Sequence, residues 1–361
     1  MALQGASRAA VAAALDSGDP LPGTAGFAGE IDGRLVRDVL GRYPLFVERD
    51  GDGGGEWSAD PADLVDPVSF PAGHVRTEAG TRQVFSLPDP TPIDDDERAV
   101  ATVREAVETS VDAVGTDGLA IAFSGGVDSA LLAARLDAPL YVAGFPDSHD
   151  VEAARSAADL LGRDLRVVEL THDAIERAVP EIVAATGRTN AMAVQIALPL
   201  SLTAERVAAD GFDRLAVGQG ADELFGGYAK VAKAPEDPRV EAETVRRAQR
   251  EVVATLADQL ERDVLALRAA GVEPVAPLLH DRVVEAALRL DDHHLVDGET
   301  RKWALRQAAT DSLPEAIATR DKKAAQYGSL AARELDRLAR QAGYKRRMDD
   351  HVTQYVESLV E

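Results

Sequence analysis

Six residues with the sequence SGGVDS, at positions 124–129, follow a short apolar run and lead directly into a helical pattern. The two glycines allow backbone amides to approach an oxyanion closely, the serines add hydroxyl donors, and the helix start contributes the positive end of its dipole. The aspartate would repel a phosphate unless a divalent cation lay between them, so the pattern predicts a phosphate loop that works with Mg2+. A glycine turn capped for stability alone is the other interpretation. The candidate ligands are Ser124, Gly125, Gly126, Asp128 and Ser129.

A second segment of the same character, GQGADELFGGY at residues 218–228, follows another short apolar run. It again combines small residues, which allow a ligand to approach closely, with a carboxylate at Asp222. If the two apolar runs form neighbouring strands, Asp128 and Asp222 can together hold Mg2+ on a triphosphate. The alternative is a capped turn stabilised by the apolar side chains of Leu224 and Phe225.

The elements that must position these segments alternate between strand and helix patterns. This alternation predicts an α/β fold, a parallel sheet with helices on both faces, followed by a chain that is almost entirely helical beyond Asp237. In such a sheet the ligand lies at the carboxyl ends of the strands, which is where both segments fall. The predicted strands are Leu119–Phe123, Leu140–Phe145, Leu165–Leu170 and Leu215–Val217, and the helices between the first three are Ala130–Leu136 and Asp150–Leu161.

The first 90 residues have a different pattern, rich in Gly, Pro and short alternating apolar segments such as Arg42–Glu48 and Gln83–Leu87. It predicts a small β-rich unit with a turn or disordered tip at Asp50–Gly55. The acidic run Asp94–Glu97 then supplies N-capping residues for a helix predicted to reach Val114. We therefore place a domain boundary near residue 90, between domains 1–90 and 91–361.

The composition excludes several classes of protein. No apolar run approaches the roughly 18 residues of a membrane-spanning helix, and the alanine-rich Arg8–Leu15 is typical of a frayed amphipathic helix rather than a signal peptide, so a cytoplasmic protein is expected. The net charge of −23 repels nucleic-acid phosphates. Only six lysines accompany the 62 acidic residues, a composition that resembles halophilic proteins, although an acidic mesophilic protein is the alternative. The absence of cysteine excludes disulfides and thiolate chemistry.

Residues 124–129 resemble the PP-loop of the N-type ATP pyrophosphatases, which cleave ATP to AMP and pyrophosphate. Residues 218–228 resemble the G-x-G-x-D-E-L-F-G-G-Y motif of the asparagine synthetase family within that group. Further matches follow in the same order, at Pro277-Leu278-Leu279, at Lys302–Arg306 and at Arg320-Asp321-Lys322, which is similar to the family's R-x-K. The resemblance covers roughly residues 94–335 and implies an ATP pyrophosphatase domain of the adenine nucleotide alpha hydrolase type.

What this resemblance implies is a ligase that forms a carbon–nitrogen bond. ATP with Mg2+ would activate the carboxylate of an amino acid, with aspartate as the expected substrate, and ammonia would then displace AMP. Lys322 would supply a cation to the leaving pyrophosphate, while Gly144 and Gly218 would line the adenosine. A solvated pair of surface lysines is the other interpretation of Lys322 and Lys323.

Three positions depart from the family pattern. Gln219 stands where the family has a glutamate that helps to deprotonate the attacking ammonium, and an amide cannot act as a base. Glu223 could take the proton instead, free ammonia could be used, or the nucleophile could differ. Val275 and His280 replace a family arginine and a frequent family aspartate. These departures bear on the aspartate substrate and not on the ATP site.

Arg37–Phe46 and Phe70–His74 resemble parts of the glutaminase domain that is fused to these synthetases. That domain needs an N-terminal cysteine thiolate, whereas position 2 here is Ala2 and the sequence contains no cysteine. We therefore expect a truncated, non-catalytic remnant and ammonia as the nitrogen source. A separate glutaminase and a homodimer are left open as partners.

Other functions compete with this interpretation. A related ligase with a different acceptor, similar to the β-lactam synthetases, is left open by Gln219. A non-catalytic ATP-binding paralogue is disfavoured because Asp128, Asp222 and Lys322 are all present. Modification of tRNA by the same ATP chemistry is disfavoured by the acidic surface and the lack of cysteine.

Overall fold

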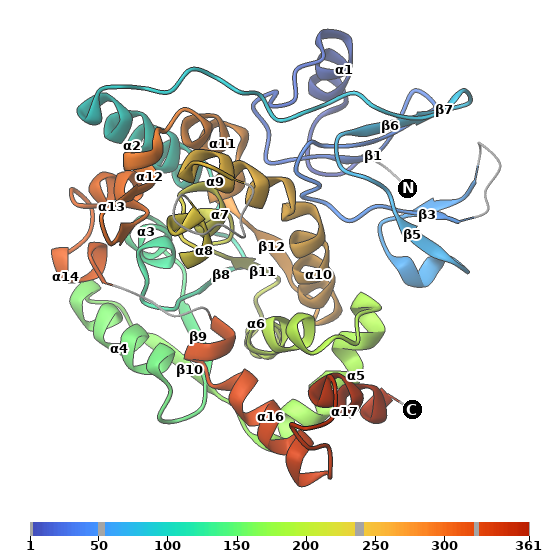
Figure 1. Cartoon of the computed structure of the whole chain (residues 1–361), viewed down its shortest axis with the longest axis vertical. Coiled ribbons are helices and arrows are strands. Elements are labelled where there is room, and N and C mark those ends of the chain that lie inside the picture. The colour runs from blue at the N-terminus through green and yellow to red at the C-terminus, as the bar shows by residue number, and fades with distance from the viewer. Residues whose placement is uncertain (1–2, 50–54, 235–241, 321–324, 361) are drawn as a thin grey trace. The chain divides into compact units, whose positions relative to one another are not determined.

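The computed structural model describes residues 3–49, 55–234, 242–320 and 325–360 (Figure 1). The chain divides into two compact units, each assembled from three separate stretches of sequence. Unit 1 comprises Met1–Val114, Gly218–Glu261 and Ala276–Asp311, and unit 2 comprises Gly115–Val217, Arg262–Val275 and Ser312–Glu361. The domain boundary near residue 90 stays a prediction.

Unit 2 is built on a five-stranded parallel sheet with the strand order β10-β9-β8-β11-β12. In the register of this sheet, Ala120 lies opposite Leu215 and Ile121 lies opposite Leu140. All residues of β9 and the first three of β8 are buried, as expected for parallel strands covered on both faces. The predicted parallel sheet is therefore confirmed. The strands are β8 (Leu119–Ala122), β9 (Leu140–Gly144), β10 (Leu165–Glu169), β11 (Arg214–Ala216) and β12 (Glu273–Val275).

Helices cover both faces of this sheet (Figure 1). The chain first moves outward from β8 to β9 and β10 through α3 (Val127–Arg135) and α4 (His149–Leu161), and then returns across the sheet to β11 through α5 (His172–Thr186) and α6 (Ala191–Ala209). Crossovers between parallel strands are right-handed as a rule, so a reversal in the direction of travel places the later helices on the opposite face. Within this arrangement α3 packs on β8, α4 on β9 and β10, and α6 on β9.

The C-terminal part of unit 2 completes a second core around α5 and α6. It contributes α14 (Glu315–Ala318), α15 (Ala325–Gly328), α16 (Ala331–Gln341) and α17 (His351–Val360). Apolar residues of α5, α6, α16 and α17 share one cluster, which provides the main burial of these helices. Its largest fully buried members include Ile175, Val194, Leu198, Leu335 and Val356.

The described chain beyond Asp237 is almost entirely helical, as expected, with two exceptions. Strand β12 pairs with β11 as an edge of the main sheet, and β13 (Val296–Asp297) and β14 (Thr300–Arg301) form a short hairpin. Both were missed because strands of two or three residues carry no measurable alternation. Pro274 also argues against a strand, but an edge strand tolerates a proline.

The N-terminal part of unit 1 is β-rich, as predicted. One antiparallel sheet has the order β1-β2-β6-β7 and a second has the order β4-β3-β5. Residues 84–87, expected to be extended, follow β7 without forming a strand, and the predicted tip at residues 50–54 lies outside the described residues. The strands are β1 (Ala28–Ile31), β2 (Arg34–Arg37), β3 (Phe46–Glu48), β4 (Trp57–Ser58), β5 (Pro67–Ser69), β6 (His74–Thr77) and β7 (Gly80–Gln83), with a 3-10 turn η1 (Pro61–Asp63).

The first helix, α1 (Arg8–Ser17), is ordered at both ends rather than frayed. Ser7 caps its first turn by accepting a hydrogen bond from the Ala10 N–H, and Gly18 ends it in the left-handed conformation. Val11 and Ala14 are buried in a cluster with Phe27 and Phe85 of the same unit. Tertiary burial, which the alanine-rich sequence does not reveal, stabilises this helix.

Apart from the β13–β14 hairpin, the other elements described in unit 1 are helices. The predicted helix after residue 94 is confirmed as α2 (Asp96–Asp112), which begins where Asp95 accepts a hydrogen bond from the Arg98 N–H. The other elements are α7 (Ala221–Leu224), α8 (Ala229–Ala232), α9 (Val245–Ala254), α10 (Leu256–Ala269, which ends in unit 2), η3 (Pro277–Leu279), α11 (Asp281–Leu288), α12 (Asp292–Leu295) and α13 (Trp303–Ala309).

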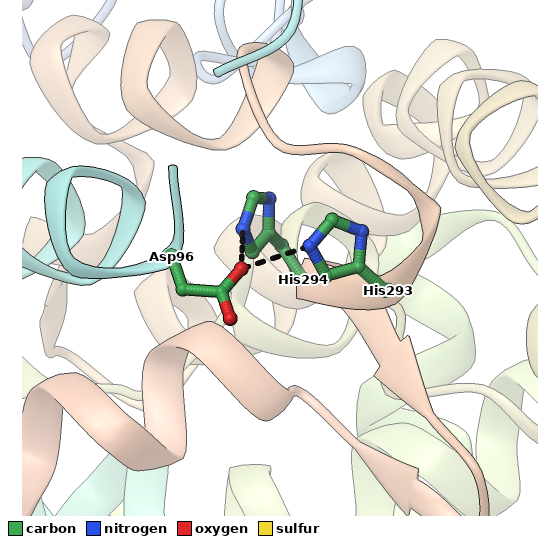
Figure 2. A group of neighbouring side chains, drawn as sticks. All are labelled: Asp96, His293 and His294. Atoms are coloured by element: carbon green, nitrogen blue, oxygen red, sulfur yellow. Dashed lines mark hydrogen bonds and ion pairs between the residues drawn. The ribbon is translucent and has the colours of Figure 1, made fainter. Parts of the chain in front are cut away.

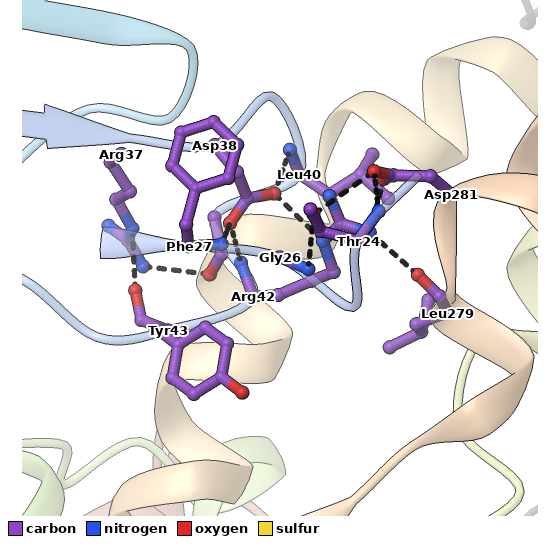
Figure 3. Close-up of polar contacts among 11 residues, drawn as sticks. Thr24, Gly26, Phe27, Arg37, Asp38, Leu40, Arg42, Tyr43, Leu279 and Asp281 are labelled. Atoms are coloured by element: carbon purple, nitrogen blue, oxygen red, sulfur yellow. Dashed lines mark hydrogen bonds and ion pairs between the residues drawn. The ribbon is translucent and has the colours of Figure 1, made fainter. Parts of the chain in front are cut away.

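A buried ion-pair network joins the N-terminal strands to the start of α11 within unit 1 (Figure 3). The Arg42 guanidinium lies 2.9 Å from Asp38 Oδ1 and 2.7 Å from Asp281 Oδ1, and it also donates to the Leu279 carbonyl. Asp281 in turn accepts hydrogen bonds from the N–H and hydroxyl of Thr24. These contacts connect the Asp38–Arg42 segment to the start of α11.

Among the helices that the structure describes, none combines the length and apolarity needed to cross a lipid bilayer.

Candidate active site

The candidate phosphate loop, Ser124–Ser129, connects β8 to α3, which is the strand-to-helix position that the sequence predicts. Gly125 adopts φ +71°, and a Cβ at this position would lie 2.5 Å from the Ala153 carbonyl oxygen and 2.9 Å from the Ala154 Cα on α4. Both the backbone conformation and the close approach of α4 therefore require glycine here. The loop is shaped by packing inside unit 2, before any ligand is considered.

The two serines of the phosphate loop are joined to each other. Ser129 Oγ accepts a hydrogen bond from the Ser124 N–H at 3.2 Å, lies 3.2 Å from Ser124 Oγ, and donates to the Gly126 carbonyl. Gly126 is the N-cap of α3 and, being glycine, offers no side chain to the first-turn amides. This donor set, with amides at a helix start and hydroxyls beside them, is chemically suited to phosphate. Asp128, half-buried in the first turn of α3, adds the carboxylate that a bridging Mg2+ needs.

Arg320 connects the C-terminal R-x-K segment to this loop. Its guanidinium donates to the Ala153 carbonyl at 2.8 Å and to Ser156 Oγ at 3.0 Å. The Ala153 carbonyl is the same group that excludes a Cβ from Gly125. The sequence assigns Arg320 no role beyond its place in the R-x-K motif, and the structure shows that it is anchored on the part of α4 that packs against Gly125. Lys322 itself, with Asp321 and Lys323, lies outside the described residues.

Strands β8 and β11, which lead into the two candidate segments, are hydrogen-bonded parallel neighbours. They also lie where the strand order reverses, because β9 and β10 follow on one side of β8 while β11 and β12 follow on the other. In open α/β sheets such a topological switch point is the place where ligands bind. The sequence-based expectation that the two apolar runs are adjacent strands is therefore confirmed.

The second loop, residues 218–228, is organised around an ion pair inside unit 1. Lys302 Nζ lies 2.8 Å from Asp222 Oδ1, with the lysine side chain 9% exposed and the aspartate side chain 47% exposed. A Cβ on Gly227 would lie 2.5 Å from Lys302 Cε and even closer to Asp222 Oδ1, so the glycine makes room for this pair. Arg301 then donates to the Gly227 carbonyl at 2.8 Å.

Lys302 was not predicted as a site residue. It has φ +59°, a left-handed conformation that costs a non-glycine residue about 1 kcal/mol, and it precedes α13. Strain of this kind at a buried, ion-paired lysine marks a position that the surrounding structure holds in place. The available signal was the scarcity of lysine, since Lys302 is one of only six in the chain.

Glu223, the candidate proton acceptor, is buried in the short helix α7. Burial raises the pKa of the Glu223 carboxyl, and the neighbouring Asp222 carboxylate acts in the same direction, while a hydrogen bond from the Tyr228 hydroxyl opposes the shift. A carboxylate with a raised pKa is a stronger base than one in water. The environment of Glu223 therefore suits proton transfer.

Gly144 and Gly218 are the two glycines that are predicted to line the adenosine. Gly144 ends β9 and is buried, and a Cβ there would lie 2.4 Å from Ser148 Oγ and 2.8 Å from Val151 Cγ2, so the packing of α4 requires glycine. Gly218 is half-buried at the start of the second loop. Their roles toward adenosine stay predictions.

The departures from the family pattern have local structural consequences. Val275 ends β12 opposite Ala216, and its carbonyl accepts a hydrogen bond from the Val217 N–H just before the second loop. His280 is the N-cap of α11, where its Nδ1 accepts a hydrogen bond from the Arg282 N–H, and burial lowers the pKa of its imidazole. Aspartate, the frequent family residue at this position, is also a good N-cap residue. His280 therefore preserves the cap of α11 and lacks the negative charge of that aspartate.

A parallel sheet with a glycine-rich loop at its switch point is an architecture common among nucleotide-binding α/β proteins. The sequence matches the asparagine synthase family over residues 102–251 and 233–357, and the chain belongs to this family. The expected fold class and family are thereby confirmed.

Individual relatives carry the same name. A protein of Methanocaldococcus jannaschii assigned as glutamine-hydrolyzing asparagine synthetase 1 is 30% identical over 283 residues, covering 68% of this chain and 52% of its own. The glutamine-hydrolyzing asparagine synthetase B of Escherichia coli is 27% identical, covering 84% and 61%. Asparagine synthetase 2 of Arabidopsis thaliana is 27% identical, covering 80% and 55%. The chain thus spans between 52% and 61% of the length of these relatives.

Proposed function

We propose that this protein is an ATP-dependent amide ligase that adenylates the carboxylate of an amino acid, with aspartate as the substrate, and amidates it with ammonia. The observation that carries the proposal is that the strands leading into residues 124–129 and 218–228 are parallel neighbours at the switch point of the sheet. Membership of the asparagine synthase family supports the same chemistry.

In this proposal ATP and Mg2+ are held by the residues that the sequence singled out. The amides and hydroxyls of the phosphate loop bind phosphate oxygens, and Asp128 and Asp222 bind Mg2+, which neutralises the charge of the triphosphate. An aspartate has two carboxylate oxygens, so the ion pair of Asp222 Oδ1 with Lys302 is compatible with a cation ligand. Lys322 follows Arg320 by two residues and supplies positive charge to the leaving pyrophosphate.

Glu223 accepts a proton from the nitrogen nucleophile, in place of the family glutamate that is Gln219 here. Its raised pKa supports this role, whereas the amide of Gln219 has no basic lone pair. Ammonia, rather than glutamine, is the proposed nitrogen source, because the chain contains no cysteine thiolate for glutamine hydrolysis.

The central test is ATP–pyrophosphate exchange with a panel of amino-acid carboxylates, followed by chromatography of the amide formed with ammonium or with glutamine. Exchange that depends on aspartate and Mg2+, and asparagine formation with ammonium but not with glutamine alone, are expected. Asp128→Asn should abolish exchange, and Asp164→Asn, an exposed aspartate of unit 2, should leave it unchanged. No exchange with any carboxylate would refute the ligase.

A second experiment addresses the proton acceptor. Glu223→Gln should lose ammonium-dependent amide formation and retain ATP–pyrophosphate exchange. Hydroxylamine is already neutral at pH 7 and needs no base before attack, so it should restore product formation in the variant. If hydroxylamine fails while exchange persists, Glu223 serves the structure rather than proton transfer.

The second candidate function is that of an amide-forming ligase that acts on a different acceptor carboxylate. Gln219 is the observation that favours it. Gln219→Glu restores the family carboxylate and should raise ammonium-dependent asparagine formation if aspartate is the substrate. Unchanged asparagine formation in this variant, together with exchange stimulated by another carboxylate, would favour the alternative acceptor.

A further inference from the structure

Asp96, His293 and His294 gather their ligand atoms at one point of unit 1 (Figure 2). Asp96 lies in the first turn of α2, and the two histidines are consecutive residues of α12. His293 Nε2 and His294 Nε2 each lie 3.0 Å from Asp96 Oδ1, and the three ligand atoms all lie within 4.8 Å of one another. The proposed ligase chemistry uses none of these residues.

We propose that Asp96, His293 and His294 bind a divalent transition-metal ion of the Zn2+ type. Two ligand atoms bound to a tetrahedral Zn2+ at about 2.0 Å lie about 3.3 Å apart, which is close to the 3.0 Å separations between the carboxylate oxygen and each imidazole nitrogen. Two imidazoles with one carboxylate form a donor set that Zn2+, Co2+ and Ni2+ accept and that Mg2+ and Ca2+ do not prefer.

The surroundings hold one histidine firmly and leave the site open on one side. His294 is fully buried, and its ring lies 5.8 Å from that of Trp303, whereas the side chains of Asp96 and His293 are 60% and 49% exposed. The rings of His293 and His294 lie side by side with centroids 3.9 Å apart, so their Nε2 atoms face the same carboxylate (Figure 2). Three protein ligands with solvent access leave a coordination position for water.

The main competing contact is a hydrogen bond from the Asp291 N–H to His294 Nδ1, at 3.3 Å. Metal binding through Nε2 moves the histidine proton to Nδ1 and breaks this bond. The loss of this hydrogen bond weakens the cap of α12, and this cost lowers the metal affinity roughly fivefold. The Asp291 side chain still accepts a hydrogen bond from the Asp292 N–H, so α12 keeps part of its cap.

A metal ion bound at this site would link the start of α2 to α12, two segments that are separated by about 200 residues in the chain. A bound ion would replace two hydrogen bonds to one carboxylate oxygen by three coordinate bonds. It would therefore stabilise unit 1 by binding only the folded state. This role does not depend on the proposed ligase activity.

The test is titration of the full chain, free of any histidine tag and of ATP, with Zn2+ in an isothermal calorimeter. One ion per chain with a micromolar or lower Kd, a rise in melting temperature, and no competition by millimolar Mg2+ are expected. His293→Ala and Asp96→Asn should each weaken binding at least tenfold. His149→Ala and Asp94→Asn, exposed residues outside the cluster, should bind as the parent does.

A spectroscopic measurement separates coordination from general attraction of cations to an acidic surface. Co2+ should give the visible absorption of a four- or five-coordinate ion in the parent chain, and this absorption should disappear in His293→Ala. Equal Zn2+ affinity in the parent and in both cluster variants would overturn the proposal, as would a Co2+ spectrum unchanged by the substitutions. Either variant is sufficient if the other fails to fold.

Discussion

The ammonium group of Lys302 lies 2.8 Å from Oδ1 of Asp222, inside a loop whose glycine at position 227 leaves just enough space for the pair. The lysine is held at the end of a hairpin, directly before α13, and reaches back to a loop about 80 residues earlier in the chain. This pairing determines where the Asp222 carboxylate points, and the first prediction follows from it.

Lys302→Met should lower the rate of ATP–pyrophosphate exchange by about 10- to 100-fold, because Asp222 loses the cation that orients it. The free energy of unfolding should change by less than about 1 kcal/mol, since methionine fills a similar volume and the desolvation cost of the buried ammonium disappears. Steady-state kinetics and urea unfolding check the two halves of this prediction. Lys345→Met, at an exposed lysine, is the control and should alter neither quantity. A large loss of stability with normal exchange would contradict it.

Gly125→Ala should destabilise the protein by about 2 to 4 kcal/mol and remove ATP-dependent activity. The substitution adds the cost of φ +71° to a Cβ only 2.5 Å from the Ala153 carbonyl oxygen, and relief of the clash must displace either α4 or the phosphate loop. Chemical denaturation and an AMP-forming assay measure both effects.

Gly162→Ala provides the matched control for this prediction. Gly162 ends α4 at φ +64°, and among the described atoms nothing lies within 4 Å of the added Cβ. This variant should therefore show only the conformational cost of about 1 kcal/mol and full activity. If Gly125→Ala behaved in the same way, the close approach of α4 would not shape the loop.

Arg42→Met should lower the free energy of unfolding by about 3 to 5 kcal/mol. The substitution leaves the carboxylates of Asp38 and Asp281 buried without the guanidinium that lies between them, which is costly in a medium of low polarity (Figure 3). Urea unfolding monitored by circular dichroism measures the change. Arg8→Met breaks the exposed Arg8–Asp32 pair, and it should cost less than about 0.5 kcal/mol. Similar losses in the two variants would argue against a structural role for the buried network.

Asp336→Asn tests the pH dependence of stability in unit 2. Hydrogen bonds from Arg346 and His351, with the nearby charges of Arg346 and Arg340, lower the pKa of the Asp336 carboxyl from 3.8 to about 2. A lowered carboxyl pKa stabilises the folded state above the unfolded pKa of about 3.9, and this contribution disappears as the pH falls from about 4 to 2. After allowance for solvent screening, the contribution is about 1 kcal/mol at pH 7.

The free energy of unfolding of Asp336→Asn should accordingly be about 1 kcal/mol below that of the parent between pH 5 and 7, and the difference should shrink below about pH 4 and vanish toward about pH 2. Denaturant titrations at several pH values in one buffer series measure the difference. Asp349→Asn, at an exposed aspartate of the same segment, is the control and should show no such convergence. A difference that grows on acidification would have the wrong sign for a carboxylate with a lowered pKa.

Much of unit 2 could be predicted from the sequence because its strands and turns are specified by short, contiguous stretches of residues. Apolar runs such as Leu119–Phe123 and Leu140–Phe145 mark strands within one or two residues of β8 and β9, and the glycines and serines of residues 124–129 mark a strand-to-helix turn. The structure follows these patterns because the burial of short apolar strands is the dominant favourable contribution to the free energy of folding. The β12 edge strand was missed because three residues that include a proline carry no such pattern.

The sequence by itself determined the glycine-rich turn between β8 and α3, the order of the first four strands of the parallel sheet along the chain and the candidate carboxylates Asp128 and Asp222. Only the tertiary structure decided that β8 and β11 are neighbours at the switch point, that Lys302 pairs with Asp222, and that Asp96 meets His293 and His294. The physical reason is that a loop conformation depends on its own few residues, whereas contacts between distant side chains depend on how helices and strands pack around a shared core.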